Sequence, residues 1–64
     1  MSINPRYKHN DKVRPLKESF IYIVDDYYIT DDNDIIYITH INNHYNNYAK
    51  EFKEEELVFA GFNY

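Results

Sequence analysis

Residues Ser19 to Asn42 decide the fold, and they read Ser-Phe-Ile-Tyr-Ile-Val-Asp-Asp-Tyr-Tyr-Ile-Thr, Asp-Asp-Asn-Asp, and Ile-Ile-Tyr-Ile-Thr-His-Ile-Asn. Two runs rich in Ile, Tyr, Val and Thr flank a cluster of turn-forming residues. Such residues favour strands, and the cluster between them favours a tight connection. The stretch therefore predicts a long β-hairpin, around which the rest of this short chain is arranged.

A turn over 31–34 sets the register of the predicted hairpin, so that Thr30 pairs with Ile35 and Tyr28 pairs with Tyr37. Side chains alternate between the two faces of a strand. The more apolar face is expected to lie against the core, with Ile23, Tyr27, Ile29, Ile36 and Ile38. The other face is expected to point outward, with Val24, Tyr28, Thr30, Tyr37, Thr39 and Ile41. The pair Asp25-Asp26 interrupts the first run and predicts a bulge, so the facing before it stays open.

The remaining segments predict a small all-β domain. Pro15 cannot donate a hydrogen bond to a neighbouring strand, so residues 11–17 are expected to form an edge strand or the end of one. Residues 47–52 favour a strand, although a helix over 48–57 is the alternative. The further expectations are a flexible lead-in over 1–10, a turn over 42–47, a 3₁₀ or helical turn over 53–56, and a last strand over 57–60 before Gly61. Five short strands in 11–64 predict one closed β-structure, because closure removes exposed edges.

Three stretches together resemble a known architecture: Asp11-Lys12-Val13-Arg14-Pro15-Leu16, the long bent hairpin, and Phe52-Lys53-Glu54-Glu55-Glu56-Leu57. Their order is similar to that of the SH3-like barrels, in which a short 3₁₀ turn precedes the closing strand. Small proteins of this kind occur in phages and prophages of low-GC Gram-positive bacteria. The resemblance implies a five-stranded SH3-like barrel over about residues 11–60. The chain has no Trp and no Ala-Leu-Tyr-Asp-Tyr stretch, so proline-peptide binding is not implied.

Composition excludes several classes of protein. The 64 residues contain no Cys, which excludes disulfides and the usual cysteine-based zinc sites. No apolar run approaches about 18 residues, and the N-terminus lacks the apolar segment of a signal peptide, so we expect a cytoplasmic protein without a membrane partner. Ile, Asn and Tyr are frequent and have A/T-rich codons, which favours a low-GC bacterium or one of its phages.

No set of residues predicts catalysis, a cofactor or a metal. His40 and His44 are separated by asparagines that favour a turn, and a zinc site also needs a third ligand, so His40 is expected instead to pair with Asp25. The Asp31–Asp34 cluster lacks the glycine and the later glutamate of a calcium loop. Asp25 and Asp26 would need a pocket to act as acid and base. The single Gly excludes a glycine-rich phosphate loop, and no nucleophile has a partner at a suggestive spacing, so we expect no enzyme.

Tyrosine is the best functional signal. The chain has eight Tyr, more than so small a core can bury, and exposed Tyr gives binding area at low entropic cost. We therefore expect a non-enzymatic interaction module that binds a protein partner. The expected contact residues are Tyr28, Tyr37, Tyr45 and Tyr48. The alternative explanation is that Tyr replaces other strand formers because of A/T-rich coding.

Charge leaves two further possibilities. Residues 1–17 carry five basic residues and one acid, whereas the rest carries two basic residues and ten acids, which gives the net charge of −4. A nucleic-acid-binding module would use the basic residues Arg6, Lys8, Lys12, Arg14 and Lys17. An acidic mimic of DNA would instead use the carboxylates at 25, 26, 31, 32, 34, 51 and 54–56 to capture a host protein. The acidic body disfavours general nucleic-acid binding.

Overall fold

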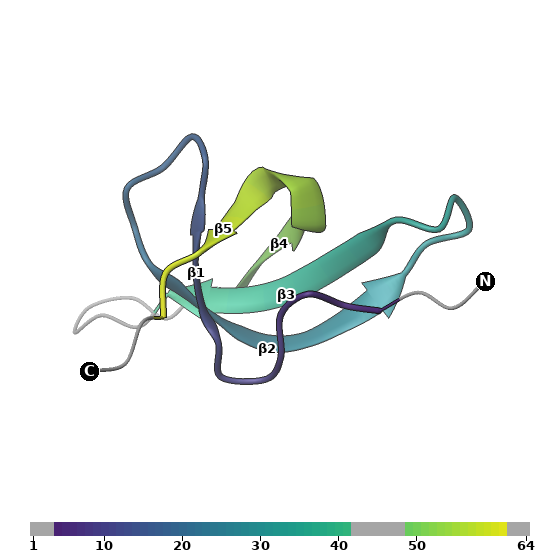
Figure 1. Ribbon diagram of the computed structural model, residues 1–64, viewed down its shortest axis with the longest axis horizontal. Coiled ribbons are helices and arrows are strands. Elements are labelled where there is room, and N and C mark those ends of the chain that lie inside the picture. Colours follow the sequence, from purple (N-terminus) through teal and green to yellow (C-terminus); the bar gives the residue numbers. More distant parts are fainter. Residues whose placement is uncertain (1–3, 42–48, 62–64) are drawn as a thin grey trace.

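The computed structural model describes residues 4–41 and 49–61, and over these residues the protein is all-β (Figure 1). One antiparallel sheet has the strand order β4-β3-β2-β1-β5. Its elements are β1 (Lys12–Pro15), β2 (Tyr22–Ile29), β3 (Ile35–Ile41), β4 (Ala49–Lys53), the 3₁₀ turn η1 (Glu54–Glu56) and β5 (Leu57–Phe59). Five strands with a 3₁₀ turn before the last one are thus confirmed. The sheet is not closed, so the barrel itself is not confirmed.

The central hairpin forms as predicted, but its register is shifted by one residue near the turn. Tyr28 pairs with Ile36, and Tyr37 pairs with Tyr27, so the predicted pairing of Tyr28 with Tyr37 is wrong. The cause is Asn33, which adopts the left-handed conformation with φ of 65°. Thr30 donates its N–H to Asp34 at 2.9 Å, which closes a three-residue loop rather than a loop of two or four residues.

The predicted facing is wrong for β3, in which Tyr37, Thr39 and Ile41 are buried and Ile36 and Ile38 lie on the opposite face. On β2, Tyr27 and Ile29 do share the face of Tyr37, but they are 42% and 43% exposed. The face with Tyr37 and Thr39 can be buried although it carries hydroxyl groups, because these groups form hydrogen bonds within the protein. The Thr39 hydroxyl, for example, donates to the carbonyl of Lys50 at 2.8 Å. The predicted bulge is confirmed, since the register shifts between Val24 and Asp26. The bulge lets Val24 and Tyr27, three residues apart, share one face.

Strand β1 lies inside the sheet, not at its edge. It pairs with β2 at Lys12 and Val13 and with β5 at Val13, Arg14 and Pro15. Pro15 is the last residue of the strand and lies beyond the ladder with β2, so its missing N–H breaks no hydrogen bond on that side. The proline therefore marks the end of a strand, which was the second of the two predicted possibilities.

Residues 49–53 form strand β4, which settles the choice between strand and helix over these positions. Turn η1 is stabilised at its start by one hydrogen bond, in which the backbone N–H of Lys53 donates to the Glu56 carboxylate at 2.9 Å. The turn predicted over 42–47 lies outside the described residues.

The core combines residues from almost every part of the fold. The buried apolar side chains are Tyr7, Val13, Tyr22, Val24, Tyr37, Ile41, Phe52 and Leu57. Tyr7 precedes the predicted domain, yet it is only 3% exposed, and its ring packs edge-on against Tyr37 with centroids 5.2 Å apart. Aromatic side chains of this size supply much of the burial that a 64-residue chain without disulfides needs.

Candidate protein-binding surface

The four predicted contact tyrosines do not lie on one surface. Tyr28 is 43% exposed and lies on β2, where a partner can reach it. Tyr37 is fully buried and belongs to the core, so it is not part of a surface. Tyr45 and Tyr48 lie outside the described residues. Of the predicted set, the structure therefore places one residue, Tyr28, on an accessible surface.

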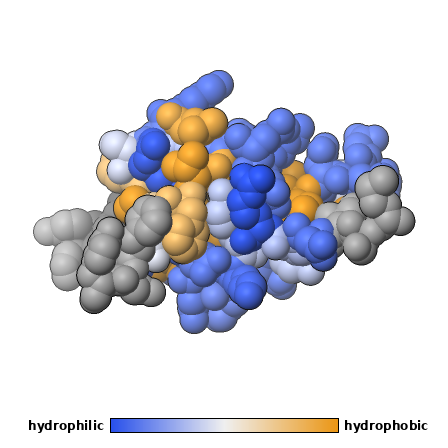
Figure 2. All heavy atoms as spheres, viewed as in Figure 1, coloured by the Kyte–Doolittle hydropathy of each residue, from blue (hydrophilic) through white to orange (hydrophobic). Residues whose placement is uncertain are grey.

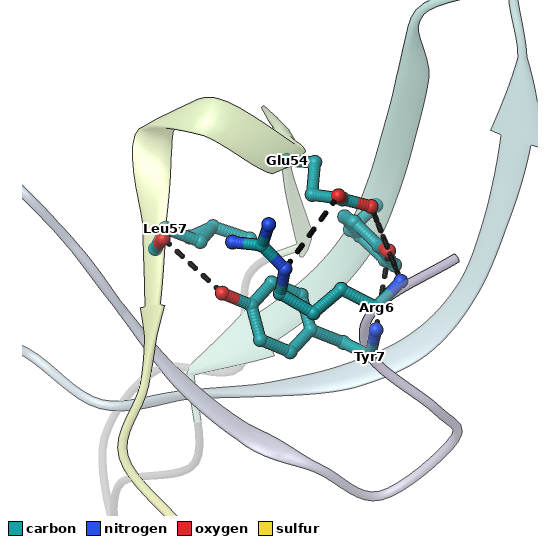
Figure 3. A network of polar contacts seen from close by, with 5 residues as sticks. Arg6, Tyr7, Glu54 and Leu57 are labelled. Atoms are coloured by element: carbon teal, nitrogen blue, oxygen red, sulfur yellow. Dashed lines mark hydrogen bonds and ion pairs between the residues drawn. The ribbon is translucent and has the colours of Figure 1, made fainter. Parts of the chain in front are cut away.

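Tyr37 has a structural role that the sequence did not reveal (Figure 3). Its hydroxyl accepts the backbone N–H groups of Arg6 at 2.8 Å and Tyr7 at 3.2 Å, and it donates to a carboxylate oxygen of Glu54 at 2.7 Å. The Tyr7 hydroxyl donates to the carbonyl of Leu57 at 3.2 Å. Burial, followed by the hydrogen bond to Glu54, raises the pKa of Tyr37 to about 12. This network fastens the segment before β1 to η1 and β5.

Tyr27, Tyr28 and Ile29 are all more than 40% exposed, and together we call them the hairpin end. They lie where β2 extends beyond its ladder with β1 toward the hairpin turn, while β4 still pairs with β3 at this level (Figure 1). The Tyr28 hydroxyl donates to Glu51 on β4 at 2.6 Å, and this hydrogen bond raises the pKa of Tyr28. Because Tyr27 pairs with buried Tyr37, it lies on the core side of the sheet, and Tyr28 lies on the opposite side.

A hollow of about 340 Å³ lies next to Tyr27, between the segment before β1 and the β2 bulge. The backbone carbonyl of Asp25 lies 2.9 Å from the Nδ1 atom of His9, which holds the two segments together. The Asp25 carboxylate lies 2.8 Å from His40, as the sequence predicted. The hollow is lined by Pro5, Tyr7, Lys8, His9, Val24, Asp25, Asp26 and Tyr27. Its size is at the lower end for ligand pockets, which are roughly 300–1,000 Å³.

A second exposed apolar group, the loop patch, consists of Leu16, Phe20 and Ile21 on the connection between β1 and β2. Leu16 and Phe20 are 58% and 59% exposed, more than any other large apolar side chain in the described part of the chain. Figure 2 shows hydrophobic side chains gathered over β1, β5 and this connection, in the left half of the view. Exposed apolar side chains that gather in this way often mark interaction surfaces.

The predicted basic residues do not form one continuous cluster. Arg6 lies 3.8 Å from Glu54, and the Arg14 guanidinium donates to the backbone carbonyls of Pro15 and Glu18. The three lysines are exposed but line different hollows of the surface. These lysines are Lys8 beside the β2 bulge, Lys12 beside Gly61, and Lys17 beside β4. Two of the five predicted contacts are thus already engaged within the protein.

The acidic groups are largely engaged in local contacts. Asp31–Asp34 lie in and beside the hairpin turn, and Asp34 lies 3.9 Å from Lys53. Asp26 accepts the backbone N–H of Tyr27 at 2.8 Å. Residues 4–41 and 49–61 contain no group of three or more His, Cys, Asp or Glu side chains arranged to hold a metal ion. His44 lies outside these residues.

Sequence reasoning missed Tyr27, Ile29 and the loop patch as exposed residues. Tyr27 and Ile29 lie on the core side of the sheet, as expected, but at an end of β2 that extends beyond its ladder with β1 and stays exposed. Leu16 and Phe20 flank the segment 17–19, which contains only charged or polar residues. This polar context was the available signal that the two side chains lie outside the core.

Comparison of the chain with models of known protein families, with curated proteins and with solved structures found no match. Among the residues that the structure describes, no helix is long and apolar enough to cross a membrane. The functional argument therefore rests on the geometry of this chain.

Proposed function

We propose that the chain is a non-enzymatic interaction module, of phage or prophage origin and cytoplasmic, that binds a protein partner through the hairpin end. The observation that carries this proposal is the exposure of three consecutive apolar or aromatic residues, Tyr27, Tyr28 and Ile29, of which Tyr27 lines a hollow of about 340 Å³. Large aromatic side chains next to a pocket are typical anchors of protein interfaces.

The hydrogen bond between Tyr28 and Glu51 supports the proposal further. It holds the Tyr28 ring in one orientation before a partner arrives, so binding loses less side-chain entropy. Tyr27 contributes from the other side of the strand, next to Lys8 and Asp26 at the rim of the hollow. An apolar centre with charged groups around it is the usual arrangement of a protein interface.

Matched substitutions test the proposal. Tyr27→Ser and Tyr28→Ser remove the anchors, and Phe20→Ser is the control because it removes a still more exposed ring from the loop patch. The immobilised wild-type protein and each variant are incubated with lysate of a low-GC Gram-positive bacterium, and captured proteins are identified by mass spectrometry. We expect a protein that the wild type and Phe20→Ser retain and that both Tyr variants lose by about tenfold or more. Circular dichroism confirms that each variant is folded. Equal capture by all four proteins would contradict the proposal.

Two alternative functions are separated by charge. A nucleic-acid-binding module would bind labelled DNA or RNA with an affinity that falls steeply with salt, and Lys8, Lys12 and Lys17 would carry it. An acidic DNA mimic would bind no nucleic acid and would capture basic proteins. Fluorescence anisotropy at low and moderate salt, with single- and double-stranded DNA and RNA, distinguishes the first alternative from the other two functions.

We also propose that the fold is SH3-like in layout. The strand order β4-β3-β2-β1-β5, with η1 linking the two outermost strands, supports this assignment. The strong bend of the hairpin at its bulge also supports it, because a bulge increases local twist and lets one strand serve two parts of a curved sheet. An experimental structure that includes residues 42–48 tests whether the sheet curls into a barrel.

A further inference from the structure

The sheet has two outer strands, and the backbone of β5 is partly covered. Leu16 donates its N–H to the carbonyl of Glu56, and Ala60 donates its N–H to the carbonyl of Lys12. The backbone N–H and C=O groups of the even-numbered residues in and beside β5 therefore point toward β1. Leu57 and Phe59 therefore direct their backbone groups to the outside. The Tyr7 hydroxyl occupies the carbonyl of Leu57, and the Tyr7 ring stacks on Phe59 with centroids 6.4 Å apart. Tyr7 therefore occupies the Leu57 end of this edge.

The other outer strand, β4, directs the backbone of Glu51 outward. Thr30 donates its N–H to the carbonyl of Asp34, so the backbone N–H and C=O groups of Asp34 and of the even-numbered residues in β3 point toward β2. The backbone groups of Tyr37 and Thr39 therefore point toward β4. Their partners in β4 are Phe52 and Lys50. The backbone N–H and C=O groups of residues 49, 51 and 53 consequently point away from β3.

The contact of Lys53 agrees with this direction, because its N–H donates to the Glu56 carboxylate and not into the sheet. Within residues 4–41 and 49–61, no turn or loop hydrogen bond engages the backbone N–H or carbonyl of Glu51. A donor and an acceptor of one residue thus lie together on an open edge, which is the arrangement that a further strand requires.

A groove of about 300 Å³ runs beside this edge. One wall is the start of the β1–β2 connection, and the other is β4. The lining residues are Pro15, Leu16, Lys17, Glu18, Lys50, Glu51, Phe52 and Glu56. The Glu18 carboxylate lies 2.8 Å from Lys50 and accepts the Tyr22 hydroxyl at 2.7 Å, and these hydrogen bonds lower the pKa of Glu18. They also hold the first wall in place, so the groove is formed before any ligand binds.

We propose that this groove takes an extended, basic peptide segment of a partner protein, which adds to β4 as a sixth strand. The peptide forms two hydrogen bonds with Glu51 and places an apolar side chain against Leu16 and Phe52. Three carboxylates and two lysines line the groove, and Lys50 is paired with Glu18, so the remaining charge favours Lys or Arg in the peptide. The peptide can pair with only a short stretch of β4, because the N–H of Lys53 already donates to the Glu56 carboxylate. The proposal uses no contact of Tyr27, Tyr28 or Ile29 with the peptide, although the Glu51 carboxylate accepts the Tyr28 hydroxyl.

A second copy of this chain is a poorer occupant. An antiparallel copy centred on Glu51 sets two Glu51 side chains opposite each other, and a copy centred on Lys50 does the same with two lysines. Like charges directly opposite destabilise a strand pair. A partner of different sequence avoids this repulsion.

The test uses the peptide Lys-Val-Thr-Val-Thr-Val-Lys with blocked ends and the isotope-labelled full chain. Nuclear magnetic resonance titration gives the affinity, and hydrogen exchange reports the Glu51 amide. We expect saturable binding and at least tenfold slower exchange of that amide. The counterpart Glu-Val-Thr-Val-Thr-Val-Glu is expected to bind at least tenfold more weakly, as is a peptide N-methylated at its central valines.

Two variants of one residue provide the matched controls. Glu51→Pro removes the outward N–H, and an edge strand tolerates proline where that group faces outward. Glu51→Gln keeps the N–H. We expect Glu51→Pro, shown to be folded by circular dichroism, to lose binding at least tenfold, and Glu51→Gln to retain it. Equal binding by both variants, no binding of any peptide at millimolar concentration, or shifts confined to 27–29 would overturn the proposal. So would a dimer, seen by analytical ultracentrifugation, that Glu51→Pro dissociates.

Discussion

Replacing Tyr37 by phenylalanine removes one oxygen atom from the centre of the fold and leaves the ring in place. The hydroxyl accepts the N–H groups of Arg6 and Tyr7 and donates to Glu54. Arg6 keeps a second partner, since its N–H also reaches Glu54 at 3.2 Å. Tyr7 is 3% exposed, and its N–H loses the Tyr37 hydroxyl as its acceptor, so the variant buries an unsatisfied donor.

The expected loss in free energy of unfolding is about 2 kcal/mol, because a buried unsatisfied group costs about 1–3 kcal/mol. A domain of this size has a total stability of only about 3–10 kcal/mol. The melting temperature should fall by roughly 8–16 °C. Urea titration followed by far-ultraviolet circular dichroism measures the loss, since the chain has no Trp.

Tyr28→Phe is the matched control for this prediction. It also removes one hydroxyl from a hydrogen bond to a glutamate, but at a surface position that is 43% exposed. We expect its urea midpoint to stay close to that of the wild type, because exposed hydrogen bonds of this kind contribute little to stability. If the two variants have the same urea midpoint and slope, the argument that the buried network anchors the segment before β1 is wrong.

Three further predictions concern pH and the turn. The raised pKa of Tyr37 means that its contribution to stability is complete below pH 10 and is lost as the pH rises through about 12; melting curves across this range should slope more steeply for the wild type than for Tyr37→Phe. The lowered pKa of Glu18 has the opposite sign, so its contribution is present above pH 4.5 and is lost below it; Glu18→Gln should flatten the melting temperature on the acid side. Asn33 has a φ of 65°, so Asn33→Val should lower stability by about 1–2 kcal/mol in a urea titration, whereas Asn33→Gly should not lower it.

Local sequence signals predicted the elements well. The turn cluster, the bulge at Asp25-Asp26, the strand over 49–53 and the 3₁₀ turn all follow from residues close together in the chain. The pairing of His40 with Asp25 also followed, because it depends on strand direction more than on exact register. Signals of this kind act over a few residues and need no knowledge of the tertiary structure.

The facing of the hairpin required information that the pattern does not hold. One left-handed residue, Asn33, changes the loop length and with it every cross-strand pair near the turn. The identity of the inner face depends on Glu54, which is distant in sequence and receives the hydroxyl of Tyr37. Because Tyr is both apolar and polar, hydropathy alone assigned Tyr37 to the surface and Ile29 to the core.

The candidate surfaces, too, were predicted only in part from the sequence. Tyr28 was predicted from composition and is exposed, whereas the open edge at Glu51 was not predicted. An edge is a property of strand order, and strand order depends on pairs such as β1 with β5 that join distant segments. No local pattern around Glu51 distinguishes an outer strand from an inner one.

The contacts of Tyr7 with Leu57 and of Arg6 with Glu54 join residues 50 and 48 positions apart. On a ribosome, the segment that carries Tyr7 emerges long before its partners are synthesised. The core therefore cannot be completed during most of translation, and the exposed rings of Tyr7 and Tyr37 must wait for the last strand. Such non-local closure is slow compared with local contacts. We expect a nascent chain arrested before Leu57 to remain sensitive to protease, and the full chain to acquire resistance in a single step.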